Sequence, residues 1–135
     1  SVDFLQCASK KKFSEMGASF VLFSSVASYE GTKGLLFYAS AKSAVRTAVR
    51  AIAKEIGHRG HRINSISPAW VDTEMTSSYL ESVGMGQESV RDGILGRGRP
   101  EDVSGMVLFL LSSRARWITG QDFVTDGGYM CGMWD

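Results

Sequence analysis

Residues 20–25 read Phe-Val-Leu-Phe-Ser-Ser, and residues 38–42 read Tyr-Ala-Ser-Ala-Lys. The first stretch is a short, continuous apolar run, which is typical of a strand buried on both faces of a parallel sheet. The second lies near the start of the longest helical pattern in the chain, where alanine, valine and isoleucine recur at helical spacing until Gly57. A buried strand followed by a long helix predicts an α/β fold.

The rest of the sequence continues this alternation of strands and helices. The predicted elements, in order, are a helix over 2–16, a strand over 20–23, a loop over 26–36, a helix over 37–56, a strand over 62–67, an irregular lid-like segment over 69–100, a helix from Pro100 and a strand over 123–125. Strands that alternate with helices predict parallel pairing with right-handed crossovers. The apolar run Met106–Leu111 is expected to form a buried helix face.

Composition and charge exclude several classes of function. The net charge is +1, so nothing favours binding to nucleic acid or to an anionic membrane. No apolar run approaches the ~20 residues that span a bilayer. The two cysteines, Cys7 and Cys131, have no metal-ligand spacing, and His58 and His61 have no carboxylate or cysteine cluster beside them. We therefore expect no metal site, and we expect reduced thiols in the cytoplasm.

Ser25, Tyr38 and Lys42 form a candidate proton-transfer group. Tyr38 and Lys42 are four residues apart on one predicted helix, so they share a face of it. A cation one helical turn away stabilises the phenolate form of a tyrosine and makes it usable as an acid and base. Ser25 lies thirteen residues before the tyrosine at the end of a predicted strand, from which its hydroxyl can hydrogen-bond a reacting oxygen.

With these residues as a starting point, the sequence resembles the short-chain dehydrogenase/reductase family, in its 3-oxoacyl-acyl-carrier-protein-reductase-like branch. The resemblance rests on ordered segments that run from about residue 20 to 128: Phe20–Ser25, the Tyr-x-x-x-Lys motif of Tyr38–Lys42, Ile63–Pro68, Val71–Thr73, Arg97–Val103, Ile118–Gly120 and Asp126–Gly128. A Tyr-x-x-x-Lys pair alone is a weak signal, whereas several segments in the order of the family make coincidence very improbable.

The resemblance implies a Rossmann-like, doubly wound parallel sheet and an NAD- or NADP-dependent oxidoreductase that acts on a carbonyl or a secondary alcohol. It implies catalytic roles for Ser25, Tyr38 and Lys42. The residues expected to contact the cofactor are Tyr38, Lys42, Pro68, Val71 and Thr73. It also implies a small-molecule substrate and a homo-oligomer, a dimer or a tetramer. The alanine-rich face from Ala41 to Ala51 either lies in the interface of this homo-oligomer or packs on the sheet.

The family's glycine-rich turn, which holds the cofactor pyrophosphate at a helix N-terminus, has no counterpart in this sequence. Residues 1–135 are therefore expected to form a single partial domain, the C-terminal half of the fold, with the N-terminal dinucleotide-binding half missing. One alternative stays open, namely a non-catalytic truncated fragment, or an oligomerisation or scaffold remnant, that lacks cofactor binding. The sequence does not decide between NAD and NADP, and we expect the lid-like segment 69–100 to set the substrate.

Overall fold

The computed structural model describes residues 17–86 and 90–131, so the helix predicted over 2–16 lies outside the described residues. The described elements, in order, are β1 (Ser19–Phe23), α2 (Ala27–Glu30), α3 (Leu36–Ile56), the 3-10 turn η1 (Gly57–Arg59), β2 (Arg62–Pro68), α4 (Glu74–Ser82), α5 (Pro100–Leu111), the 3-10 turn η3 (Ser113–Ala115) and β3 (Asp122–Thr125). Each predicted strand is present, and each begins or ends within a residue or two of its predicted bounds.

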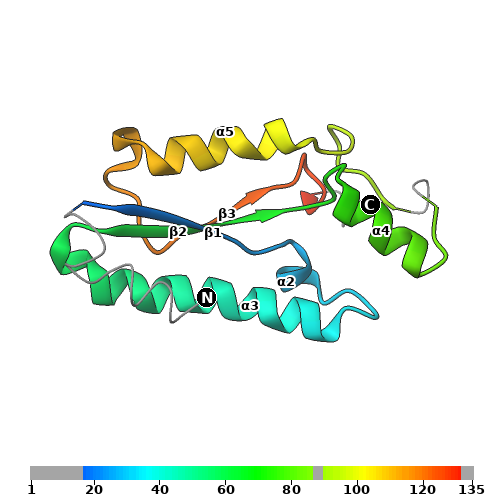
Figure 1. Cartoon of the computed structure of the whole chain (residues 1–135), viewed down its shortest axis with the longest axis horizontal. Coiled ribbons are helices and arrows are strands. Elements are labelled where there is room, and N and C mark those ends of the chain that lie inside the picture. Colours follow the sequence, from blue (N-terminus) through cyan, green and yellow to red (C-terminus); the bar gives the residue numbers. More distant parts are fainter. Residues whose placement is uncertain (1–16, 87–89, 132–135) are drawn as a thin grey trace.

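The three strands form one parallel sheet in the order β1-β2-β3. Phe20 lies opposite Ile63, and Ser65 lies opposite Asp122. In Figure 1, α5 covers one face of this sheet, while α2 and α3 cover the other. The parallel pairing predicted from the alternation of elements is therefore confirmed, because each crossover passes over a face through a helix.

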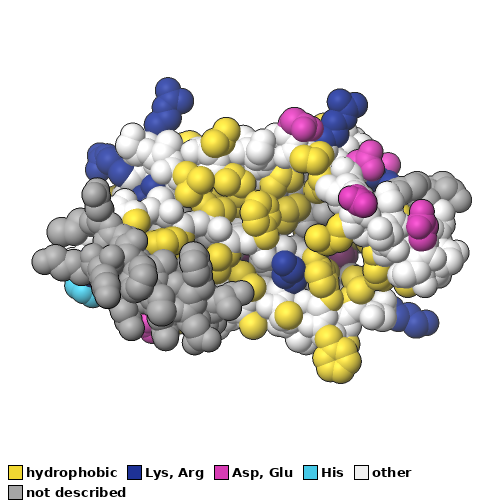
Figure 2. Space-filling view, viewed as in Figure 1, with side chains coloured by type: hydrophobic (Ala, Val, Ile, Leu, Met, Phe, Trp, Pro, Cys, Tyr) yellow, Lys and Arg dark blue, Asp and Glu magenta, His cyan; other side chains and the backbone are white. Residues whose placement is uncertain are grey.

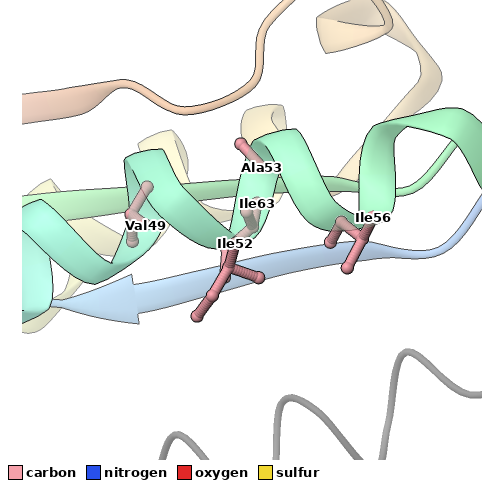
Figure 3. Close-up of a cluster of buried hydrophobic side chains, with 5 residues drawn as sticks. All are labelled: Val49, Ile52, Ala53, Ile56 and Ile63. Atoms are coloured by element: carbon pink, nitrogen blue, oxygen red, sulfur yellow. The ribbon is translucent and has the colours of Figure 1, made fainter.

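The face of the sheet under α3 is closed by aliphatic side chains. Val49, Ile52, Ala53 and Ile56 follow helical spacing and pack on Ile63 of β2, as Figure 3 shows. Val49 and Ile63 are fully buried. This apolar stripe determines which side of α3 faces the sheet, because no other side of the helix has the same apolar spacing.

The opposite face is closed by α5. Val103 and Leu110 of α5 pack against Ile66 of β2, and the helix begins with Pro100 in its first turn. The Asp102 carboxylate accepts the backbone N–H of Arg99 at 2.7 Å, which caps the helix start. The run Met106–Leu111, expected to form a buried helix face, is buried only in part: Leu110 is fully buried, whereas Leu111 is 45% exposed and Leu108 is 67% exposed. A helix that packs on one sheet can bury only one side of a six-residue apolar run.

One other segment differs from its prediction. The loop predicted over 26–36 contains a helical turn, α2, which ends at Gly31 with φ +64°. A left-handed residue after the turn favours glycine, and that glycine is the only signal of α2 in the sequence. The segment 69–100 is expected to contain short helices of its own, and the nine-residue helix α4 confirms this; α4 begins after Thr73 because the Thr73 side chain accepts the Thr76 N–H at 3.3 Å.

Several apolar and small side chains are exposed on the surface of this fold. Figure 2 shows hydrophobic side chains gathered between α5 and α3. The alanine-rich face of α3 is packed on the sheet only in part, because Ala48 contacts the buried cluster over β2 whereas Ala41, Ala44 and Ala51 are exposed. Within the described residues, β1 pairs only with β2, so its other edge is unpaired there. In the same part of the chain, no helix is both long and apolar enough to cross a membrane.

His61 gives the fold a defined dependence on pH. Its side chain is buried, and its Nδ1 accepts the backbone N–H of Ala18 at 3.1 Å. Burial lowers the pKa of His61, and the charges of Arg59 and His58 lower it further. The unfolded chain therefore takes up this proton first as the pH falls. We expect stability to be fully present above about pH 6.5, the ordinary pKa of histidine, and to decrease below it.

Urea unfolding at a series of pH values between neutral and mildly acidic measures this dependence. His61→Asn keeps an acceptor for the Ala18 N–H but cannot be protonated, so its stability should change less below neutrality than that of the native chain. His58→Asn is the matched control, because His58 is exposed and burial is the main cause of the lowered pKa of His61, so this variant should keep most of the acid-dependent loss. Equal pH profiles for the native chain and His61→Asn would contradict the assignment.

Candidate active site

The predicted site residues lie where the parallel strands end. Ser25 follows β1, and the turn from Val71 to Thr73 follows β2. The two segments are held beside each other past the ends of the strands, because the backbone N–H of Val26 donates to the carbonyl oxygen of Pro68 at 3.1 Å. The carboxyl ends of parallel strands are where α/β proteins bind ligands, since the loops there leave a crevice.

Ser25 is positioned by the turn that begins α2. Its Oγ accepts the backbone N–H of Ala27 at 3.2 Å, while its carbonyl oxygen accepts the Ser28 hydroxyl at 2.7 Å. Because the Ala27 N–H occupies an acceptor position of Oγ, the hydroxyl hydrogen of Ser25 remains available as a donor. Ser25 is half-buried and can present that hydrogen to an oxygen in the adjoining space.

Tyr38 and Lys42 lie on the same face of α3, in its first two turns. The Lys42 Nζ lies 5.6 Å from the centre of the Tyr38 ring. It also donates to the carbonyl oxygen of Phe23 at 3.0 Å, which holds the ammonium group at the end of β1. An ammonium group has three donors, so two remain for a ligand. The Tyr38 side chain is 43% exposed, so its hydroxyl is accessible from the adjoining space.

The turn from Val71 to Thr73 is fixed by hydrogen bonds to two other segments. Gly98 accepts the backbone N–H of Asp72 at 2.8 Å and donates its own to the carbonyl oxygen of Trp70 at 3.2 Å. The Thr76 hydroxyl donates to the carbonyl oxygen of Val71 at 2.7 Å. Gly98, two residues before Pro100, thus lies beside the turn and forms a short parallel bridge with Val71.

One cavity of about 600 Å³ brings all of the predicted site residues together. Its lining includes the three predicted catalytic residues and the other predicted cofactor residues, namely Ser25, Tyr38, Lys42, Pro68, Val71 and Thr73. The wall also contains the exposed apolar side chains of Phe23, Met75 and Leu108. Apolar walls suit a flat heteroaromatic ring, while a cation and hydroxyl groups suit a ribose, so this donor set fits the nicotinamide riboside end of NAD or NADP.

A buried carboxylate beside the site was missed by the sequence prediction. Asp122 begins β3, and its side chain is 5% exposed. It accepts hydrogen bonds from Ser65 and Ser67 of β2 and, at 2.6 Å, from the Tyr29 hydroxyl of α2. The Arg46 Nε of α3 lies 3.7 Å from the same carboxylate. We refer to these five residues as the Asp122 network.

The Asp122 network ties α2 to the sheet and to α3. The Arg46 guanidinium lies 3.4 Å from the centre of the Tyr29 ring and donates to the carbonyl oxygen of Ser28 at 3.2 Å. Burial raises the pKa of Tyr29, and its hydrogen bond to Asp122 raises it further, so the hydroxyl stays a donor at neutral pH. Since α2 follows Ser25 directly, the network holds the segment that positions this serine.

A second cavity, of about 310 Å³, adjoins the first, and the sequence prediction missed most of its lining. Ser25 and Tyr38 line both cavities, whereas Lys42, Val71 and Thr73 line only the larger one. The smaller cavity is formed by α2, the loop after it, residues 69–70 and α4. Its position depends on which loops meet in space, and no local pattern in the sequence encodes that.

Comparisons with known proteins indicate what the chain is similar to. A family model described as enoyl-(acyl carrier protein) reductase matches residues 2–130. The 3-oxoacyl-(acyl-carrier-protein) reductase of Chlamydia muridarum is 36% identical over 109 residues, which cover 80% of this chain and 43% of that protein. A solved short-chain type dehydrogenase/reductase from Mycobacterium ulcerans aligns with a TM-score of 0.75 and 36% identity, over 86% of this chain and 42% of that one.

A second solved structure, ElxO with NADP bound, aligns with a TM-score of 0.76 and 25% identity. That alignment covers 95% of this chain and 51% of the ElxO chain. The chain thus spans about half the length of the relatives that it matches.

Proposed function

Because the chain belongs to the short-chain dehydrogenase/reductase family, we propose that it carries the catalytic residues of an NAD(P)-dependent oxidoreductase. The proposed reaction reduces a carbonyl to a secondary alcohol, or runs in reverse. The observation that carries the proposal is the convergence of six residues from three segments on one cavity: Ser25, Tyr38, Lys42, Pro68, Val71 and Thr73. The NADP in the related ElxO structure supports the choice of cofactor.

In the proposed mechanism Tyr38 moves the proton. During reduction its hydroxyl donates a proton to the carbonyl oxygen of the substrate, and during oxidation its phenolate takes the proton from the alcohol. Ser25 hydrogen-bonds the same oxygen through the hydroxyl hydrogen that its contact with Ala27 leaves available. Lys42 places a positive charge on the same face of α3, with its Nζ 5.6 Å from the centre of the Tyr38 ring.

The larger cavity is the proposed cofactor side of the site. When bound there, NAD(P) supplies or accepts the hydride, which side chains cannot do. The two donors that remain on Lys42 would bind the nicotinamide ribose, and the turn from Val71 to Thr73 would bind the carboxamide. Phe23 and Leu108 would exclude water from the ring.

Titration of the purified chain with NADPH and NADH, followed by fluorescence, tests the cofactor side directly. We expect weak but saturable binding through the nicotinamide end alone, because the glycine-rich turn that holds the pyrophosphate has no counterpart in this sequence. We expect Lys42→Ala to weaken this binding about tenfold, because a hydrogen bond from a charged group is lost. Lys54→Ala is the matched control, since Lys54 is an exposed lysine at the other end of α3 and should leave binding unchanged. Consumption of NADPH in the presence of a panel of small ketones then measures turnover.

Absence of binding to either cofactor, with the chain folded, would contradict the proposal and favour the non-catalytic alternative. Equal binding by the native chain and Lys42→Ala would contradict the assignment of the larger cavity alone.

We further propose that residues 1–135 form a single partial domain, in which the segment 69–100 acts as a lid over the site. The lid would include α4 and the turns that dock beside β3, where the backbone N–H of Leu95 donates to the carbonyl oxygen of Gly127 at 2.9 Å. A homo-oligomer is also proposed. The exposed alanines of α3 support it, because small side chains on a helix allow the close approach of a second helix.

A further inference from the structure

The smaller cavity approaches the proposed catalytic residues from a different side than the larger one. Its walls are mainly apolar or aromatic: Val26, Ala27, Leu35, Trp70, Met75 and Tyr79. The Trp70 and Tyr79 rings are stacked with their centres 6.2 Å apart. At about 310 Å³ it is near the lower end of the size range of small-molecule sites, roughly 300–1,000 Å³. A small organic molecule placed there reaches both Ser25 and Tyr38.

One charged residue lines this cavity in the described part of the chain, and it is Glu30 at the end of α2. Both Glu30 carboxylate oxygens lie 3.3 Å from the Tyr129 hydroxyl, and one of them lies 3.3 Å from the Thr32 hydroxyl. These contacts are near the upper distance limit for hydrogen bonds between oxygens. A carboxylate has about four lone-pair positions, so the Glu30 side chain retains acceptor capacity for a ligand.

The Tyr129 hydroxyl is a hydrogen-bond donor to the Glu30 carboxylate. Burial raises the pKa of the Tyr129 hydroxyl, and the charge and hydrogen bond of Glu30 raise it further, so the hydroxyl is a donor to Glu30 at neutral pH. The positive charge of Arg91 acts in the opposite direction on Tyr129, but Arg91 does not line the smaller cavity. The wall that a ligand meets therefore combines apolar side chains and a few hydroxyl groups with a single carboxylate among the described residues, that of Glu30.

We propose that Glu30 selects the substrate. The site takes small ketones or secondary alcohols that carry a further hydrogen-bond donor, which is a hydroxyl or an amino group apart from the reacting carbon. It rejects substrates that carry a carboxylate. This inference rests on the proposed function, which assigns the larger cavity to the cofactor and so leaves the smaller cavity, which Ser25 and Tyr38 also line, for the substrate. A donor on the substrate satisfies the acceptor that an apolar cavity otherwise leaves partly unpaired. A substrate carboxylate instead meets a like charge among apolar walls, where charge repulsion is stronger than in water.

Three aryl ketones of similar size separate the contributions of charge and donor. 3-Acetylbenzyl alcohol carries a donor, 3-acetylbenzoate carries a negative charge, and 3-methylacetophenone carries neither. Their dissociation constants are measured with the full chain by calorimetry or by ligand-observed NMR. We expect the alcohol to bind tightest and the benzoate about tenfold more weakly than the alcohol. In Glu30→Gln the two values should approach each other to within about twofold.

Glu81→Gln is the matched control, because Glu81 is exposed on α4 and does not line either cavity. It should keep the tenfold preference of the native chain. Failure of all three ketones to bind, or a preference that Glu30→Gln leaves unchanged, would overturn the inference. Should Glu30→Gln not fold, the native preference measured at rising salt decides, because a preference based on charge shrinks as salt screens it. A preference that salt does not change overturns the inference.

Binding is measured without cofactor, so this outcome is separate from that of the proposed function. Loss of NADPH turnover with the Glu30-dependent preference intact would refute the proposed reaction and leave the ligand preference standing. Normal NADPH turnover with a ligand preference that does not depend on Glu30 would overturn the ligand preference and leave the proposed reaction standing.

Discussion

Tyr38→Phe is expected to lower kcat for ketone reduction by about 10²–10⁴-fold, the range over which a positioned acid or base contributes to catalysis. The variant keeps the aromatic ring on α3 beside Lys42 but removes the only atom that exchanges a proton with the substrate. Lys42, Val71 and Thr73 are unchanged, so NADPH should still bind. The expected signature is therefore a large loss of kcat with little change in the dissociation constant of NADPH.

Steady-state NADPH consumption and fluorescence titration on the same preparations measure the two quantities. Tyr29→Phe is the matched control, because it removes a tyrosine hydroxyl that bonds Asp122 and lines neither of the two site cavities. Its cost should appear in stability, at about 1 kcal/mol for one hydrogen bond, and far less in kcat. A Tyr38→Phe variant with native kcat would refute the proposed proton transfer.

Asp122→Ala is expected to destabilise the fold by about 3 kcal/mol, as does removal of one partner from a buried charge pair. Asp122 is 5% exposed on its side chain, and its carboxylate joins β2, β3, α2 and α3 through the Asp122 network. Without it, the Arg46 guanidinium and the hydroxyls of Ser65 and Ser67 lose their shared acceptor. Urea unfolding measures the change as a difference in the free energy of unfolding.

Glu55→Ala serves as the matched control, since Glu55 is an exposed acid on α3 and should change the free energy of unfolding by less than about 0.5 kcal/mol. A double variant separates charge from packing. Arg46→Met in the Asp122→Ala background removes the uncompensated cation, so the two changes together should cost less than their sum. Strict additivity, or a cost for Asp122→Ala no larger than that of the control, would show that the network contributes little to stability.

Much of the architecture could be predicted because its causes are local. The run Phe20–Phe23 is apolar at every position and is a strand in the structure, although the strand is only partly buried and Phe23 is 50% exposed. The stripe from Val49 to Ile56 has the period of a helix and packs on β2. Pro100 and Asp102 mark the start of α5 because proline and an acidic capping residue favour the first turn.

The elements that were missed depend on contacts between distant residues. The turn α2 is too short to have a helical period, and it is held instead by Asp122, which lies 93 residues after Tyr29. The exposure of Leu108 depends on which side of α5 meets the sheet, and the run of apolar residues around it hides that choice. Glu30 is the only acid between Ser25 and Tyr38 in the sequence, which is a signal in retrospect but does not show what the side chain faces.

The sequence by itself determined the parallel α/β arrangement and the set Ser25, Tyr38 and Lys42, because strand burial, helical spacing and strand ends are properties of neighbouring residues. Only the tertiary structure decided that Pro68, Val71 and Thr73 share a cavity with that set. It also decided that Glu30 lines a second cavity, which shares Ser25 and Tyr38 with the first. The physical reason is that a cavity is bounded by loops from several segments. Their meeting is fixed by long-range hydrogen bonds such as those of Gly98 and Asp122, and the spacing of residues along the chain does not encode these bonds.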